Sequence, residues 1–169
     1  MRIIVSDSSC LIDLRKASLL EAFLSLPYEI LIPNTLFEDE LLKFSVDQKQ
    51  ALLDGGLQVV DIPSTGVLRA QEVIRIKPGL SVHDGFAFAL AESHDDCILV
   101  TGDGDLRTLA ATHGIEVHGL LWIVEQIHQN GVKPGRDLAI ALRIIEQDPT
   151  VRLPRRELMT AIRRYEGQP

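Results

Sequence analysis

Cysteine, aromatic residues and long apolar runs are all scarce in this chain of 169 residues. The two cysteines, Cys10 and Cys97, have neither the spacing of a zinc site nor that of a redox motif, so we expect both to be buried free thiols. No stretch reaches the roughly 18 apolar residues that a membrane-spanning helix needs. Met1-Arg2 leads straight into an apolar run, without the pattern of a signal peptide. We therefore expect a cytoplasmic protein that makes no contact with a membrane.

Positive charge is also scarce, since the formal net charge is −7. A general nucleic-acid binder would usually be basic, so this balance argues mildly against that class. The charge is uneven, however: residues 149–169 hold five arginines and two glutamates, whereas the other 148 residues hold 12 basic and 22 acidic groups. An acidic body with a basic end can bind a polyanion when cations neutralise the acidic part.

Short apolar runs alternate with helical patterns over the first two thirds of the chain, which predicts an α/β fold with a parallel sheet covered by helices. We expect a domain over residues 1–118, an α/β/α sandwich of about five strands, and a C-terminal helical extension over residues 119–169 that packs on it. The strands are expected at residues 2–6, 28–32, 57–62, 97–101 and 115–117, and the three C-terminal helices at residues 119–130, 134–147 and 153–166.

Acidic residues follow two of the expected strands, where ligands bind in open α/β sheets. Asp7 ends the first apolar run, and Asp103 follows the fourth. Asp105 is better placed to cap the next helix, whereas Asp103 is better placed for a site. Asp84 comes three residues after Ser81, which is a capping box. That cap alone would explain Asp84, but the same geometry also directs it into the crevice at the sheet edge.

A further acid comes from the helix expected to run from residue 34 to about residue 44. Phe37, Leu41 and Phe44 recur at helical spacing and define its apolar face. Glu40 lies on that face and Asp39 nearly opposite. Because a carboxylate among core-facing side chains is costly unless it is paired or bound to a metal, Glu40 is the better candidate for a site.

Four candidate acids, Asp7, Glu40, Asp84 and Asp103, thus come from four separate places and converge on one sheet edge. Like charges so close repel one another and raise pKa values, which favours a bound cation. Hard carboxylate oxygens select Mg²⁺ or Mn²⁺. The five histidines have no mutual ligand spacing, so we expect them on the surface or in linkers: His83, His94, His113, His118 and His128.

Taken together, four segments resemble the PIN-domain nucleases, and most closely the VapC-like toxins of prokaryotic toxin–antitoxin pairs. The resemblance covers residues 2–118 in order and spacing, and the later helices resemble the C-terminal extension of some prokaryotic PIN proteins. The segments are Asp7-Ser8-Ser9-Cys10-Leu11-Ile12, Pro33 to Glu40-Leu41, Leu80-Ser81 with Asp84-Gly85-Phe86-Ala87, and Leu99-Val100-Thr101-Gly102-Asp103-Gly104-Asp105-Leu106.

The resemblance implies a PIN-like fold and a hydrolase that cuts RNA phosphodiester bonds with Mg²⁺ or Mn²⁺. Its catalytic acids map onto Asp7, Glu40, Asp84 and Asp103, although the helix-borne acid also aligns with Asp39 without a gap. Asp7, Asp84 and Asp103 would hold metal, and Asp105 matches a less constant acid of the same group. Ser9 and Thr101 match supporting hydroxyls. The resemblance further implies RNA as the substrate, an antitoxin protein as a candidate partner, and a homodimer.

The basic end supplies candidates for substrate binding. If residues 153–166 are helical, Arg152, Arg156 and Arg163 fall roughly on one side, where they would hold RNA or an acidic partner. Leu158, Met159 and Ile162 would form an apolar stripe on this helix that docks on the body. Solvated helix charge that pairs with acids of the body is the alternative.

Two other enzyme-like classes fit less well. An aspartyl-nucleophile phosphatase needs a second Asp where this chain has Ser9, and a receiver domain needs a Lys where it has His118. The main alternative is a PIN fold without turnover, which would act as a binding or adaptor module.

Overall fold

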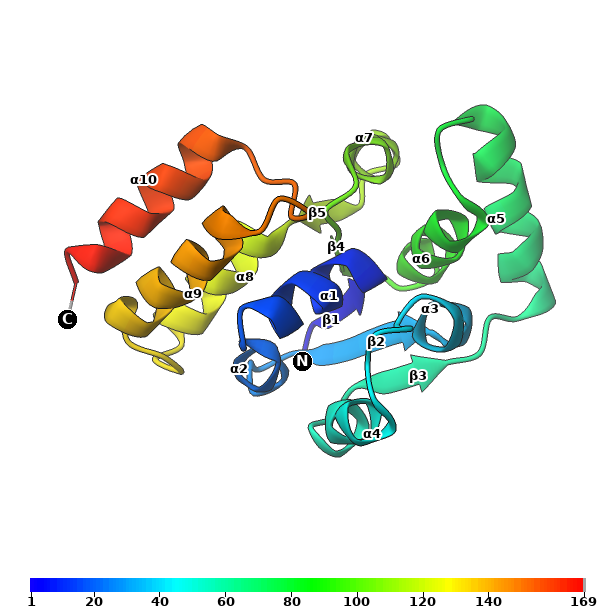
Figure 1. The fold of residues 1–169 in the computed structure, drawn as a ribbon. Coiled ribbons are helices and arrows are strands. Elements are labelled where there is room, and N and C mark those ends of the chain that lie inside the picture. The colour runs from blue at the N-terminus through cyan, green and yellow to red at the C-terminus, as the bar shows by residue number, and fades with distance from the viewer. Residues whose placement is uncertain (169) are drawn as a thin grey trace.

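A five-stranded parallel sheet forms the centre of the computed structural model, which describes residues 1–168 (Figure 1). The strand order is β3-β2-β1-β4-β5, and every neighbouring pair is parallel. This confirms the expected fold class. The strands are β1 (Ile3–Ser6), β2 (Glu29–Pro33), β3 (Gln58–Val60), β4 (Ile98–Val100) and β5 (Glu116–His118).

Helices lie on both sides of this sheet (Figure 1). The first seven are α1 (Ser8–Lys16), α2 (Leu20–Leu24), α3 (Asn34–Asp39), α4 (Val46–Asp54), α5 (Ser64–Ile76), α6 (Val82–Glu92) and α7 (Gly104–Thr112). The last three are α8 (Leu120–Gln129), α9 (Gly135–Gln147) and α10 (Arg155–Glu166).

Helix α3 is shorter than the sequence predicts, because it ends at Asp39 instead of continuing to about residue 44. Glu40 still has helical backbone angles as its C-cap. Beyond it the chain turns, and both Leu41 and Phe44 are buried. Burial of these two side chains is thus achieved by a turn, whereas the apolar spacing predicted a continuous helix.

The core is built around β1 and β4, two of the three inner strands, whose side chains are buried on both faces of the sheet, as is typical of parallel sheets. Ile4, Val5, Ile98, Leu99 and Val100 have no exposed surface. Helix α6 packs against β1, β2 and β4, and α5 packs along α6. A Cβ atom on Gly85 would lie 3.0 Å from the carbonyl oxygen of Ala70, so glycine permits this close approach of the two helices.

The three C-terminal helices share the core of the sheet. Helices α8 and α9 contact α1, and α10 packs along α9 (Figure 1). Ile123, Leu142 and Ile162 have no exposed surface and belong to the same buried cluster as the strands. Cys10 and Cys97 are buried and unbonded, as predicted. Among residues 1–168, no helix combines the length and the apolar character that crossing a bilayer requires.

The position of β1 determines where a site can form. The chain moves from β1 to β2 and β3 on one side, and later returns to place β4 on the other side of β1. Beyond the carboxyl ends of two such strands the connections diverge, which leaves a crevice in sheets of this type. Asp7 follows β1 and Thr101 follows β4, so both residues stand at this crevice.

Candidate active site

Asp7 is the most buried acid of the crevice, with 4% of its surface exposed. Its backbone N–H donates to the carbonyl of Val100 at 2.9 Å, which fixes it beside the end of β4. One carboxylate oxygen, Oδ2, accepts hydrogen bonds from Thr101 Oγ1 at 2.8 Å and from Ser9 Oγ at 3.0 Å. Ser9 in turn accepts from the backbone N–H of Gly102 at 3.0 Å. The hydroxyls of Ser9 and Thr101 thus hold Asp7 in a single orientation.

Glu40 enters the crevice from the end of α3. Its Oε1 accepts a hydrogen bond of 2.7 Å from Ser8 Oγ, in the first turn of α1. The side chain of Asp39 instead remains 60% exposed, with Oδ2 3.2 Å from Nε2 of His83. The structure therefore places Glu40 beside Asp7, and Asp39 at the rim with His83.

Asp84 and Asp103 lie at the starts of two helices that face the same edge. Asp84 completes the predicted capping box, because its Oδ2 accepts from the backbone N–H of Ser81 at 2.8 Å. Asp103 caps α7, because its Oδ1 accepts from the backbone N–H of Leu106 at 2.8 Å. The expectation that Asp105 is the better cap was wrong, since α7 begins at Gly104 and Asp105 falls within its first turn.

Electrostatic repulsion links these acids. Burial is the main cause that raises the pKa of Asp7 to about 6, and the negative charges of Asp84 and Glu40 raise it further against the hydrogen bonds from Thr101 and Ser9. Burial likewise raises the pKa of Asp84; its bonds with Ser81 lower it, the charge of Asp103 raises it and His83 lowers it. Asp7 and Asp84 are therefore the two acids of this group whose ionised forms are destabilised, mainly by burial.

The chemistry of these side chains fits a hard divalent cation. A desolvated, mutually repelling set of carboxylates is stabilised when a cation neutralises it. Within residues 1–168, however, no three His, Cys, Asp or Glu side chains are already arranged around one point as metal ligands. Each helix cap uses a single carboxylate oxygen, Oδ2 of Asp84 and Oδ1 of Asp103, so the caps do not engage the second oxygen of either carboxylate.

Asp105 has a different neighbour. Its carboxylate lies 3.8 Å from Nζ of Lys77, and the side chain is 54% exposed. Asp105 therefore lies beside the end of α5, and its role as a metal ligand stays a prediction.

The basic end places its arginines in different surroundings. Arg152 precedes α10, so the expected helical face does not include it. It lines a hollow of about 260 Å³ together with Ser9, Lys16 and Asp103. Arg156 lines a second hollow beside Trp122, and Arg163 is exposed. The apolar stripe of α10 does dock, because Leu158 and Ile162 are buried and Met159 packs against the core.

Sequence reasoning missed three residues around the acids. Ser8 holds Glu40, Lys16 shares the hollow with Arg152, and His83 is half-buried beside Asp39 although we expected it on the surface or in a linker. The helix that starts directly after Asp7 signals Ser8, because its first turn must face the same crevice. No pattern signals Lys16, since Thr150 and Arg152, which line the same hollow, lie far along the chain.

Comparison with known proteins bears on the family of the whole chain. A family model described as a PIN domain matches residues 3–166, which includes the C-terminal helices. No protein of curated function matches the chain significantly. PIN domains are generally nucleases that use divalent metals and act on nucleic acid. Because the match spans nearly the whole sequence, this chain belongs to the PIN-domain family.

Proposed function

We propose that this chain is a metal-dependent endoribonuclease that hydrolyses RNA phosphodiester bonds with Mg²⁺ or Mn²⁺. The observation that carries the proposal is Asp7, a buried carboxylate held by two hydroxyls at the carboxyl edge of β1 and coupled to Asp84 and Glu40. A carboxylate that is desolvated and repelled in this way has a structural cost, and binding a cation for catalysis offsets that cost.

The positions of these residues indicate a separate role for each of them. Asp7, Asp84 and Asp103 would hold the ion, with Ser9 and Thr101 keeping Asp7 oriented. A bound divalent ion supplies an acidic water and neutralises charge on the phosphate in the transition state. Glu40, held by Ser8, would orient the attacking water and accept its proton.

The hollow beside the acids suits the anionic substrate. Lys16 and Arg152 line it together with Ser9 and Asp103. Lys16 Nζ is 3.6 Å from Asp148, whereas Arg152 makes no ion pair with any other part of residues 1–168. Arg152 is thus the better placed of the two to contact a phosphate next to the scissile bond.

The test is cleavage of end-labelled single-stranded RNA, with single-stranded DNA of the same sequence beside it. Purified protein with Mn²⁺ should cut RNA at internal positions, and EDTA or Asp7→Asn should stop it. Cutting that persists in both conditions would contradict the proposed role of the acids. Binding of RNA without any cutting would favour the alternative, a PIN-fold binding module.

The toxin role is a further part of the proposal and rests on the resemblance to VapC-like toxins. A toxin of this kind has an antitoxin partner encoded beside it. Inspection of the adjacent reading frame tests this, because a short protein with a DNA-binding part and a tail is expected there. Co-expression of that protein should suppress cleavage of RNA.

A further inference from the structure

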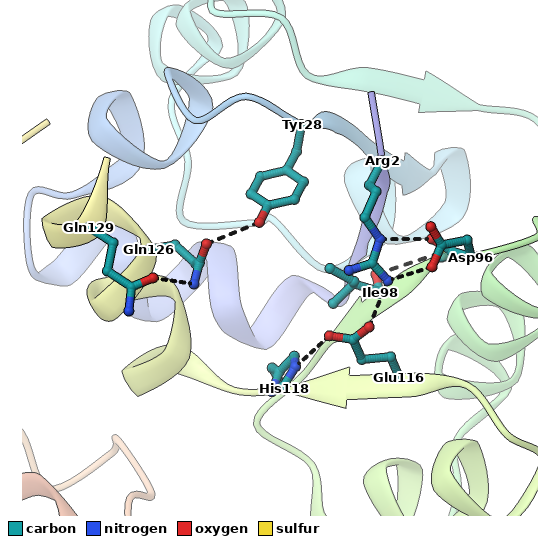
Figure 2. Close-up of polar contacts among 9 residues, drawn as sticks. Arg2, Tyr28, Asp96, Ile98, Glu116, His118, Gln126 and Gln129 are labelled. Atoms are coloured by element: carbon teal, nitrogen blue, oxygen red, sulfur yellow. Dashed lines mark hydrogen bonds and ion pairs between the residues drawn. The ribbon is translucent and has the colours of Figure 1, made fainter. Parts of the chain in front are cut away.

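Arg107 is an exposed arginine of α7 whose side chain makes no hydrogen bond or ion pair with any residue in 1–168. It lies one turn after Asp103, whose carbonyl accepts from its backbone N–H at 3.0 Å. Arg2, by contrast, lies 2.8 Å from Asp96 and 2.6 Å from Glu116, so two carboxylates match its charge (Figure 2). The charge of Arg107 is thus available to a ligand.

The guanidinium of Arg107 lies against Gly119, the residue that follows β5. A Cβ atom on Gly119 would be 2.9 Å from Nη1 of Arg107 and 3.5 Å from the carbonyl oxygen of Thr101. The φ of Gly119 is −123°, which residues of any type adopt, so the backbone does not require glycine at this position. What glycine provides here is room for the guanidinium.

This contact places the guanidinium at the sheet edge that carries the acids. Thr101 follows β4, and its backbone N–H donates at 3.0 Å to the carbonyl of His118, the last residue of β5. The hydroxyl of the same Thr101 donates to Asp7 at 2.8 Å. The ends of β1, β4 and β5 thus lie side by side. Since neighbouring strands are about 4.8 Å apart, the end of β5 is roughly 10 Å from that of β1.

The buried thiol of Cys10, on α1, lies within electrostatic reach of both groups. Burial raises the pKa of this thiol well above its usual range, and the charges of Asp7 and Asp13 raise it further. A hydrogen bond with Ser9 and the positive charge of Arg107 lower that pKa. The charge of Arg107 therefore acts on the same side chain as the charge of Asp7.

The neighbours of Gly119 hold its backbone in place. The rings of His118 and Trp122 stack with centroids 4.5 Å apart and an angle of 5° between the planes. His118 Nε2 also lies 2.9 Å from Glu116, whose other oxygen accepts from Arg2 at 2.6 Å (Figure 2). Because the backbone is fixed on both sides, a methyl group added at Gly119 would displace the flexible end of the arginine.

From this arrangement we infer that Arg107 binds a backbone phosphate of the RNA that flanks the scissile one on the β5 side of the acids. A guanidinium binds phosphate oxygens through charge-assisted hydrogen bonds. A cation at Asp7 would contact the scissile phosphate, and the guanidinium would hold the strand where it continues along the carboxyl edge toward β5. The inference rests on the proposed function, because it names a further point at which the same nuclease holds its substrate.

The affinity for single-stranded RNA tests this contact. The probes are fluorescently labelled 12-nucleotide oligoadenylate and oligouridylate, added with Mg²⁺ to Asp7→Asn protein so that neither is cut. Losing one phosphate contact in Arg107→Gln should make the log–log slope of affinity against salt shallower by about 0.7, which weakens binding about fivefold at 0.1 M salt. Both oligomers should lose affinity equally, because a phosphate contact reads no base. A loss confined to one oligomer, or an unchanged slope, would overturn the inference.

Gly119→Ala tests the same contact with the arginine still in the chain. Its methyl group displaces Nη1 of Arg107, so binding should weaken, although less than in Arg107→Gln. Added to Arg107→Gln, the Gly119→Ala change should have no further effect, because both changes remove one contact. Additive losses would show that Gly119 affects binding by another route and would overturn the inference.

Further variants control for charge and for folding. Arg107→Lys keeps a cation and should largely keep the salt slope. Arg155→Gln is the matched control, since Arg155 pairs with Glu146, and it should bind as its parent does. Thermal melting of each variant separates lost binding from lost folding. Unchanged binding by folded Arg107→Gln protein contradicts the inference, and if that variant does not fold, unchanged binding by folded Gly119→Ala protein does so.

Cleavage assays separate this inference from the proposed function. If wild-type protein cuts RNA and Arg107→Gln leaves both KM and RNA affinity unchanged, the function stands and the phosphate contact is refuted. If wild-type protein cuts nothing but its RNA binding still depends on Arg107, the contact stands and the nuclease proposal fails. A lower kcat with unchanged RNA affinity would mean that Arg107 acts on the acids instead, and would overturn the inference.

Discussion

Ser8 donates a hydrogen bond of 2.7 Å to Glu40, and this bond joins the first turn of α1 to the end of α3. Asp39, one residue earlier, lies at the rim and contacts His83 instead. Glu40 and Asp39 thus differ in their access to an ion bound near Asp7.

Glu40→Gln should weaken Mn²⁺ binding, whereas Asp39→Asn should leave it nearly unchanged. Wild-type protein at a hundredfold excess of Mn²⁺ over Kd should gain about 2.7 kcal/mol of unfolding free energy, because only the folded state binds the ion. Thermal melting across a Mn²⁺ titration measures this for all three proteins. Weaker binding in the Asp39 variant alone would instead favour the gapless alignment.

Asp7→Asn should abolish cleavage of RNA without loss of the fold. The amide oxygen of Asn can still accept the hydrogen bonds from Thr101 and Ser9, while the repulsion from Asp84 and Glu40 disappears. Cleavage rates and urea denaturation check both parts. Asp61→Asn, at an exposed position, is the control and should retain activity. A well-folded Asp7→Asn protein with full activity would contradict the assignment.

Without metal, the contribution of Asp7 to the free energy of unfolding should fall as pH rises toward neutrality. Its pKa is raised from an ordinary 3.8 to about 6, so between these values the folded protein holds a proton that the unfolded chain has released. Folding favours the protonated form of Asp7, and its ionisation lowers the free energy of unfolding by at most about 3 kcal/mol. The measurement is urea denaturation in EDTA from pH 4.5 to 7.5.

Comparison with Asp7→Asn isolates this contribution, because acids with lowered pKa values, such as Glu92 and Glu116, act in the opposite direction in both proteins. The unfolding free energy of Asp7→Asn, relative to that of the wild type, should therefore increase as pH rises. Parallel pH profiles of the two proteins would show that Asp7 does not carry the raised pKa.

The basic end should contribute to the salt dependence of RNA binding. Each phosphate neutralised adds about −0.7 to the log–log slope of affinity against salt on single strands. Changing Arg152, Arg156 and Arg163 together to Gln in Asp7→Asn protein should make the slope shallower, whereas Arg155→Gln should not. An unchanged slope would mean that these arginines do not touch RNA and would leave a partner-binding or structural role.

Gly85→Ala should destabilise the fold by about 1–3 kcal/mol through overpacking. The new Cβ would lie 3.0 Å from a backbone oxygen and 3.1 Å from the Cβ of Ala70, and neither α5 nor α6 can retreat without disturbing the core. Urea denaturation measures the change, and Gly104→Ala is the control, since a Cβ there meets no atom within 4 Å. Equal stability of the two variants would show that the helices can separate at little cost.

Much of the fold follows from local patterns in the sequence. The runs before Asp7 and Thr101 are apolar because both faces of β1 and β4 are buried, and the Ser81 capping box marks the start of α6. The end of α3 could not be predicted, because a turn buries Leu41 and Phe44 as well as a helix would. Local spacing does not distinguish these two solutions.

The acids of the site were predictable individually, and their partners less so. Asp7 and Asp103 follow strands, which local sequence shows. The neighbours around these acids come from tertiary contacts between distant segments, such as Lys16 with Asp148 and Asp39 with His83. These pairings depend on how helices pack, and packing is set by the whole core.

The strand order also has a consequence for how the chain folds. β1 is made first, yet Ile4 pairs with Ile98, so one edge of β1 stays unpaired until the chain has been made as far as β4. Closing such a long loop is slow compared with forming local helices. Asp103 follows β4 by three residues, so the segment that pairs the second edge of β1 also brings the last of the four acids. An N-terminal fragment that ends before Asp103 therefore lacks both β5 and one of the four carboxylates, so the proposed activity should appear only after that part of the chain has been made.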